Sequence, residues 1–247
     1  MTRSRHNLAR GLAAFVATCS LFLLGVLPSA SASPVGTLTT EQESQIRDGL
    51  EAYGVGQDVQ DSLISKIIAG ETWDSLAGAE PVAVEQRLIR GELVTLSTYA
   101  DGSITASGVE RATPVDPGSI RPFDVSRCTS RQSGQVRIKT GCNVWASTVL
   151  ITMSFEADYN QTFSASDPVW VTAGSIVAVR YANASTLAGT YSVRNFGRTQ
   201  INATASSPAK ARLTLDVQAV GGGAATTVWL QLNVPTNTYS LGYSSIN

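Results

Sequence analysis

The feature that most constrains the fold of this chain is a regular alternation of apolar and polar residues in its second half. It is clearest at residues 149–159, 209–219 and 228–234, where every second residue is apolar or small. Successive side chains of a β-strand point to opposite faces, so this period of two indicates strands with one buried face and one solvent-exposed face. Further strands are expected at 136–140, 169–172, 176–181, 190–196 and 199–206. About eight strands without intervening helices predict an antiparallel β-sandwich, with a small barrel as the alternative.

Two amphipathic helices are predicted ahead of these strands, at residues 40–53 and 58–69. Thr40 and Glu43 fit a capping box at the start of the first helix. Apolar residues recur at helical spacing in both segments, namely Ile46, Leu50 and Tyr53 in the first, and Val59, Leu63 and Ile67 in the second. A short glycine-containing link joins the segments, which predicts a helical hairpin.

A β-hairpin is predicted at residues 92–110, because two alternating runs flank the turn dipeptide Asp101-Gly102. The segment 113–122 contains three prolines and a glycine, which are typical of a linker. The charge balance also changes there. Residues 33–120 hold 14 acidic and 5 basic residues, a net charge of −9, whereas residues 121–247 hold 5 acidic and 10 basic residues, a net charge of +5.

These features predict an α+β, mainly β protein. An acidic module of helical hairpin and β-hairpin occupies 33–112, a linker 113–122, and a β-sandwich domain 123–247. We expect the two modules to dock, because their charges attract and two helices cannot bury their apolar stripes alone. The alternative is that the stripes await an external partner.

The first 32 residues have the features of a secretory signal peptide. Arg3, Arg5 and Arg10 are followed by an apolar or small run at 12–27, and Ala30-Ser31-Ala32 forms an A-x-A cleavage site. Cleavage after residue 32 would release a secreted, extracellular protein with no membrane segment. A retained membrane anchor is the alternative, although the run is short for a spanning helix.

The cysteine and histidine content limits the disulfides, catalytic sites and metal sites that the chain can form. Two cysteines remain after cleavage, Cys128 and Cys142, and in an exported chain they predict one disulfide, with two buried free thiols as the alternative. The only histidine is His6. A chain without it has no Ser-His-Asp or Cys-His catalysis and no histidine-ligated metal site. With no glycine-rich phosphate loop either, we expect no cofactor and no metal.

Two groups of residues are candidates for a functional site. Glu156 and Asp158 are two apart on a predicted strand, so their carboxylates would share a face and could serve glycoside hydrolysis or bind calcium. A solvated outer face explains them equally well. Trp229, Gln231 and Tyr239 have the composition of a sugar-binding platform. Alternatively, Trp229 packs under a loop or against the helical module.

Five stretches resemble uncharacterised secreted proteins of Gram-positive bacteria, of the actinobacterial type. They are Tyr53-Gly54-Val55, Gly70-Glu71-Thr72-Trp73-Asp74-Ser75-Leu76, Tyr99-Ala100-Asp101-Gly102-Ser103, Phe155-Glu156-Ala157-Asp158-Tyr159 and Trp229-Leu230-Gln231-Leu232-Asn233. The resemblance implies an exported bacterial protein with a sandwich domain. It carries over no activity and no functional residue.

The functional hypothesis that follows is a secreted, non-catalytic protein that binds a component of the cell envelope or of a neighbouring cell. The basic β domain would favour anionic wall polymers such as teichoic acids, through arginine and lysine contacts. The expected partner is thus a cell-wall polymer, a glycan or another protein, and not a nucleic acid. The alternatives are a carboxylate-based, glycosidase-like hydrolase and a protein-binding or inhibitory module.

Overall fold

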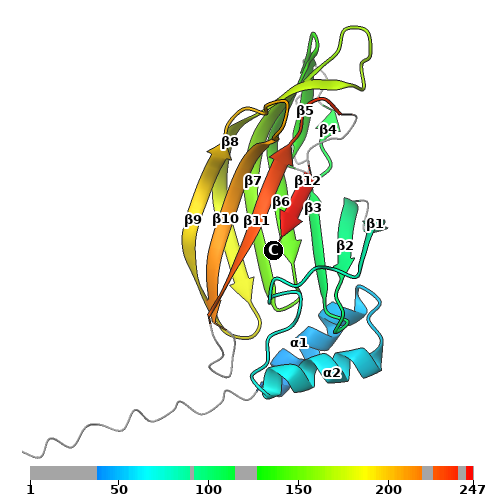
Figure 1. The fold of residues 1–247 in the computed structure, drawn as a ribbon, viewed down its shortest axis with the longest axis vertical. Helices are drawn as coiled ribbons and strands as arrows, with labels where there is room; N and C mark the ends of the chain where they lie inside the picture. Colours follow the sequence, from blue (N-terminus) through cyan, green and yellow to red (C-terminus); the bar gives the residue numbers. More distant parts are fainter. Residues whose placement is uncertain (1–37, 90–91, 115–126, 219–224, 239–242, 247) are drawn as a thin grey trace, which may run out of the picture. The chain divides into compact units, whose positions relative to one another are not determined.

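The structure, a computed structural model, describes residues 38–89, 92–114, 127–218, 225–238 and 243–246. The expected signal peptide lies outside these residues. Ser33–Asn247 form one compact unit. Its described part has two helices and twelve strands (Figure 1). They are α1 (Thr40–Glu51), α2 (Gln57–Ile68), β1 (Ala83–Ile89), β2 (Glu92–Thr98), β3 (Ile104–Val109), β4 (Thr113–Pro114), β5 (Thr129–Ser133), β6 (Val136–Ser147), β7 (Ile151–Phe163), β8 (Val171–Thr186), β9 (Thr190–Gln200), β10 (Ala209–Gln218), β11 (Thr226–Val234) and β12 (Tyr243–Ile246).

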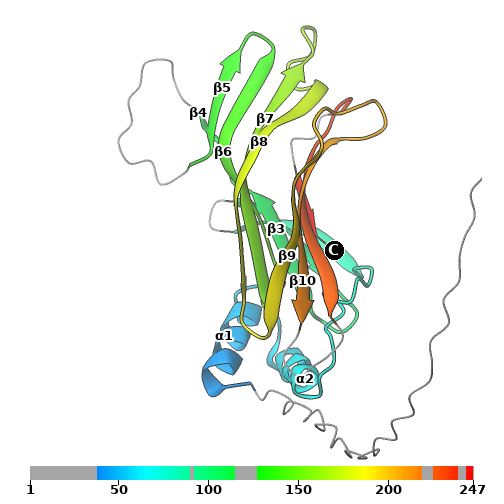
Figure 2. The same cartoon turned by 90° about the vertical axis from the view of Figure 1, so that its left-hand side faces the viewer.

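The strands form two sheets, which confirms the expected α+β, mainly β class. In the larger, eight-stranded sheet, β6 pairs with β7 along one edge and with both β5 and β3 along the other. β8 follows β7, whereas β2 and then β1 follow β3. The smaller sheet has the order β12-β11-β10-β9. All pairs are antiparallel except β4 with β5. Figure 2 shows the two sheets as layers, with β7 and β8 facing β9 and β10.

The alternation of the sequence explains which faces of the sheets meet. In β7, β10 and β11, the side chains on the apolar face are buried and those on the opposite face are at least partly exposed. The exceptions on the opposite face are Gln231 and Asn233 of β11, which are buried. The buried side chains of both sheets belong to one hydrophobic core. Burial of an apolar side chain contributes about 1.5–3 kcal/mol, so this shared core is the main stabilising element of the sandwich.

Helix α1 begins at Thr40, but its N-cap lies one residue earlier than the sequence motif suggested. The capping box is formed by Thr39 and Gln42, so the expected box of Thr40 and Glu43 is wrong. Thr39 Oγ1 accepts from the Gln42 amide at 3.1 Å, and Gln42 Oε1 accepts from the Thr39 amide at 3.0 Å. Gln42 Nε2 also donates to the carbonyl of Leu187 at 2.8 Å, a long-range contact that joins α1 to the residue directly after β8.

The helices pack on the strands through the predicted apolar stripes. Ile46, Leu50, Leu63 and Ile67 are buried in the same core as the sheets. A Cβ added at Gly49 would lie 2.7 Å from the side chain of Val149, which shows how closely α1 approaches the turn before β7. The apolar stripes of the helical hairpin are therefore covered within this chain.

The segments on either side of the expected linker share one sheet. Residues 106–109 of β3 pair with residues 144–147 of β6. Thr113–Pro114 form β4, and residues 115–122 lie outside the described part of the chain. The two expected modules therefore meet in one sheet and one core.

Some strands differ from those expected, because irregularities reset the period of two. Strand β1 was not anticipated from the sequence. The two runs expected at 169–172 and 176–181 form the single strand β8, whose pairing with β7 shifts register three times. Similarly, β9 covers 190–196 and the start of the run expected at 199–206, with two register shifts against β10.

A disulfide joins Cys128 and Cys142, as predicted. Cys142 lies in β6, and Cys128 directly precedes β5, the strand that pairs with β6. In the part of the chain that the structure describes, neither helix is long and apolar enough to cross a membrane.

Candidate functional site

The carboxylates of Glu156 and Asp158 lie on the outer face of β7, and arginines engage both of them. Arg180 of β8 donates to the two Asp158 oxygens at 2.6 and 2.9 Å. Its Nε lies 3.4 Å from Glu156 Oε2, while Arg127 donates to Glu156 Oε1 at 3.1 Å. The structure thus brings the two candidates together, but as members of an ion-pair cluster.

This ion-pair cluster holds Asp158 in its charged form. Burial raises the pKa of Asp158, but hydrogen bonds from Arg180 and from the Gly141 amide outweigh burial, so its pKa lies below the ordinary value. A glycosidase acid needs a raised pKa, so that it carries the proton it donates to the leaving oxygen. The arrangement instead ties β6, β7 and β8 together.

Trp229 and Gln231 lie on the outer face of β11, where an arginine covers the indole of Trp229. The guanidinium of Arg212 lies 4.4 Å from the centre of the Trp229 ring. Arg212 also donates to Gln231 Oε1, and Gln231 Nε2 donates to Asn233 Oδ1 at 2.7 Å. Gln231 and Asn233 are buried, and Tyr239 lies outside the described residues. Arg212 therefore occupies the aromatic face on which a sugar would stack.

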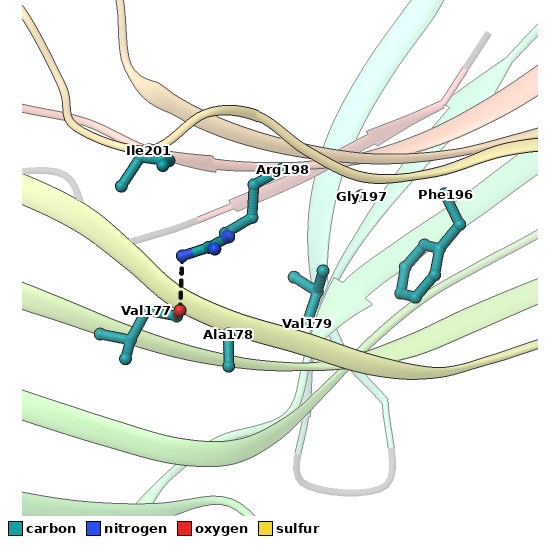
Figure 3. A pocket seen from close by; sticks show the side chains of 7 residues that line it. All are labelled: Val177, Ala178, Val179, Phe196, Gly197, Arg198 and Ile201. Atoms are coloured by element: carbon teal, nitrogen blue, oxygen red, sulfur yellow. Dashed lines mark hydrogen bonds between the residues drawn. The ribbon is translucent and has the colours of Figure 1, made fainter.

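A groove of about 500 Å³ runs between β8 and β9, which are outer strands of the larger and the smaller sheet (Figure 3). It is lined by Val177, Ala178, Val179, Phe196, Gly197, Arg198 and Ile201. Arg198 donates across it to the carbonyl of Val177 at 2.6 Å. The side chains of Val177 and Ile201 are each half exposed. We call this site the β8–β9 groove.

A strained aromatic residue lies on β8 close to this groove. Tyr181 has a φ of 54°, a left-handed conformation that is uncommon for a residue other than glycine. It falls where the pairing of β7 with β8 shifts register, and its side chain is 71% exposed. Bulges that redirect a side chain at a sheet edge are common beside binding sites.

A second polar site lies on the inner face of the larger sheet, between β6 and β7. The register places Lys139 opposite Tyr159 and Arg137 opposite Gln161. Lys139 Nζ donates to Tyr159 Oη at 3.2 Å. The guanidinium of Arg137 lies over the ring of Phe163, 4.5 Å from its centre. We call these five residues the cationic cluster.

Gln161 is the unusual member of the cationic cluster. Its side chain is 0% exposed, and neither Oε1 nor Nε2 has a hydrogen-bond partner. Leaving a buried amide unpaired costs about 1–3 kcal/mol, so such a group in a folded protein calls for an explanation, such as a bound ligand. Neither Arg137 nor Lys139 forms an ion pair with a carboxylate of the described residues.

Lys139 is held in a desolvated place beside a second positive charge. Burial and, next, the charge of Arg137 lower the pKa of Lys139 from 10.5 to about 8. Burial also raises the pKa of Tyr159 above its ordinary value of 10. An anion placed among these residues would favour the charged lysine and could accept hydrogen bonds from the lysine, the arginine and the amide.

The expected strand at 136–140 did not reveal the cationic cluster, because a bulge interrupts β6 directly after it. The bulge between Lys139 and Cys142 reverses the faces of β6, so odd-numbered residues point inward before it and even-numbered residues after it. Gly141 sits in this bulge with a φ of 69°. A glycine inside a strand pattern signals a bulge, and this signal was present in the sequence.

Comparisons with known proteins add no assignment. No family model matches the chain, and no curated protein or solved structure matches it. Among the residues that the structure describes, no group of three or more His, Cys, Asp or Glu is placed to hold a metal ion.

Proposed function

We propose that this protein is exported and acts as a non-catalytic binding protein, which takes an anionic group of a cell-envelope polymer in the cationic cluster. The observation that carries the proposal is the fully buried, unpartnered amide of Gln161 beside two cations that have no carboxylate partner among the described residues. A phosphate of a wall polymer such as a teichoic acid matches this set of donors. Arginine can hold its oxygens in a bidentate way, and lysine adds a point charge.

Export is supported by the amino-terminal segment and by the disulfide. Three arginines, an apolar run and the small residues Ala30-Ser31-Ala32 are the parts of a cleaved signal peptide. The Cys128–Cys142 disulfide is typical of oxidising compartments outside the cytosol. The resemblance to secreted proteins of Gram-positive bacteria supports a bacterial cell surface as the place of action.

Binding to purified cell walls across a salt series tests the proposal. We expect Lys139→Met to weaken binding at least tenfold, whereas Lys210→Met, which removes the same charge from β10, leaves it unchanged. Gln161→Leu keeps the net charge and should also weaken binding, because the amide donor is lost. Absence of binding at every salt concentration would refute the proposal, as would equal binding by Lys139→Met and Lys210→Met.

Binding of an extended polypeptide in the β8–β9 groove is a second candidate function. It is supported by the position of the groove between two outer strands, by its exposed apolar lining and by the strained Tyr181 nearby. Outer strands can accept an added strand through backbone groups. At this groove, however, the Ile176 amide donates to the carbonyl of Ile201 at 2.8 Å and Arg198 donates to the carbonyl of Val177, so a peptide would be held mainly by the apolar side chains. Val177→Asp should abolish capture of peptides from an immobilised library, whereas Val169→Asp, outside the groove, should not. Equal capture by the two variants would argue against this function.

Carboxylate-based hydrolysis has the least support, because Arg180 holds Asp158 ionised and also approaches Glu156. It predicts activity on a panel of glycans that is lost in Glu156→Gln. We expect no such activity from the wild-type protein.

A further inference from the structure

Strand β1 is an outer strand of the larger sheet that is exposed on both faces. Six of its seven residues are exposed, and it pairs with β2 in unbroken register from Ala83 to Ile89. Natural edge strands are usually protected from pairing with other chains by charged side chains, a proline or a bulge. Within its seven residues, β1 has no proline and no bulge, and its two charged residues, Glu85 and Arg87, carry opposite charges. No other strand of the described residues pairs with its outer edge, which is therefore a template for a strand with complementary charges.

The same hairpin carries exposed apolar side chains on one face. Leu88 lies opposite Leu93 of β2. Val84 lies on the same face of β1 as Leu88, four residues before it. All three apolar side chains are more than half exposed, and Leu88 reaches 71%. The opposite face of β2 points its Val94 into the core, so these side chains lie outside the core.

The sequence of β1 is complementary to itself. When two copies of Ala83–Ile89 run antiparallel with Gln86 opposite Gln86, each Glu85 faces Arg87 of the second copy. In the same register, each Val84 faces Leu88 of the second copy on the apolar face. A shift by two residues in either direction places Glu85 opposite Glu85, or Arg87 opposite Arg87, and like charges directly opposite are destabilising. One register therefore satisfies both faces.

We propose that β1 pairs with β1 of a second copy of this chain about a twofold axis at Gln86, which joins the two larger sheets into one continuous sheet. Closed twofold dimers with identical surfaces in contact are the commonest protein assemblies. In the single chain, Glu85 and Arg87 of the same strand form an ion pair, and both side chains are about half exposed. Exposed pairs of this kind contribute little, so exchanging partners across the dimer costs little.

Charge reversal tests the pairing directly. Sedimentation velocity should show that the wild-type chain dimerises with increasing concentration. Glu85→Arg and Arg87→Glu should each raise the dimer dissociation constant at least tenfold. In a dimer of either variant, residues 85 and 87 that face each other across the interface carry the same charge. An equimolar mixture of the two variants should restore dimers, because every facing pair is then opposite in charge. A wild-type chain that is monomeric up to millimolar concentration would overturn the proposal, as would a mixture that stays monomeric.

The register has its own test in the folded chain. Directly opposite residues have Cβ atoms about 4.5–5.5 Å apart, so Gln86→Cys should be joined to its copy by a short bifunctional thiol reagent. Thr95→Cys lies opposite Gln86 on β2, one strand further from the axis. Its copy would be three strand spacings away, about 14 Å, and should not be linked. Equal linking of the two variants would overturn this register, and circular dichroism confirms that each variant is folded.

Discussion

Lys139 gives the protein an expected pH dependence at the scale of one residue. Its pKa is about 8 in the folded chain and near 10.5 when unfolded. Between these values the unfolded chain binds more protons, so the free energy of unfolding should rise with pH from about 8, by about 2 kcal/mol near pH 10. Above pH 10 the raised pKa of Tyr159 acts in the opposite direction, because only the unfolded tyrosine loses its proton.

Denaturant titrations in a phosphate-free buffer at pH 7, 8, 9 and 10 measure this effect. Lys139→Met should remove the rise and should be more stable than the wild type at pH 7. Lys210→Met, with its lysine on the outer face of β10, should keep it. A wild-type stability that is flat or falling between pH 8 and 10 would show that Lys139 is not held in a desolvated site.

At the scale of elements, the bulge in β6 decides which side chains reach the inner face. Gly141 has a φ of 69°, and an added Cβ would lie 2.8 Å from the carbonyl oxygen of Arg127. Gly134 also has a positive φ, 59°, but nothing lies within 4 Å of its added Cβ. Gly141→Ala should therefore cost about 3 kcal/mol and Gly134→Ala about 1 kcal/mol, since the left-handed conformation alone costs about 1–2 kcal/mol.

Unfolding in urea measures both costs, and wall binding provides a second readout. Gly141→Ala should weaken binding as well, because the bulge turns Lys139 inward. Equal destabilisation by the two substitutions would mean that the close contact with Arg127 can relax.

The elements also show what a sequence can and cannot predict. Residues 209–219 and 228–234 keep the period of two without interruption, and they were correctly predicted as strands. The helices were predicted to within one or two residues, but the N-cap is Thr39, whose partner Gln42 also donates to the carbonyl of Leu187, a contact that no local motif reveals. Strand β1 was missed because neither of its faces is buried, so burial imposes no pattern on it. The cationic cluster was missed because one bulge exchanged the faces of β6.

In the complete protein, dimerisation through β1 and anion binding in the cationic cluster would reinforce each other. A dimer through β1 would carry two cationic clusters, and a wall polymer repeats its anionic group many times. The second contact is then made within one complex, so the overall affinity exceeds that of a single site without any new contact. Dimer formation and single-site binding remain separable, because Glu85→Arg acts on the first and Lys139→Met on the second.

The shared core predicts that the helices and the sandwich unfold together. Leu63 of α2 is 0% exposed and belongs to the same core as both sheets, whereas Ile68 of the same helix is 53% exposed. Leu63→Asp should cost about 4 kcal/mol or more, because it removes a buried apolar group and buries a carboxylate, and Ile68→Asp should cost less than about 1 kcal/mol.

Calorimetry and circular dichroism test whether this loss is global. A single transition should move to lower temperature in Leu63→Asp, with the calorimetric and van't Hoff enthalpies equal, because β3 and β6 lie in one sheet. Two separated transitions in the wild type, with the helical signal lost first, would show that residues 38–114 unfold independently of the sandwich. The helices would then be a separate layer on the core, and their apolar stripes would be free to meet another partner.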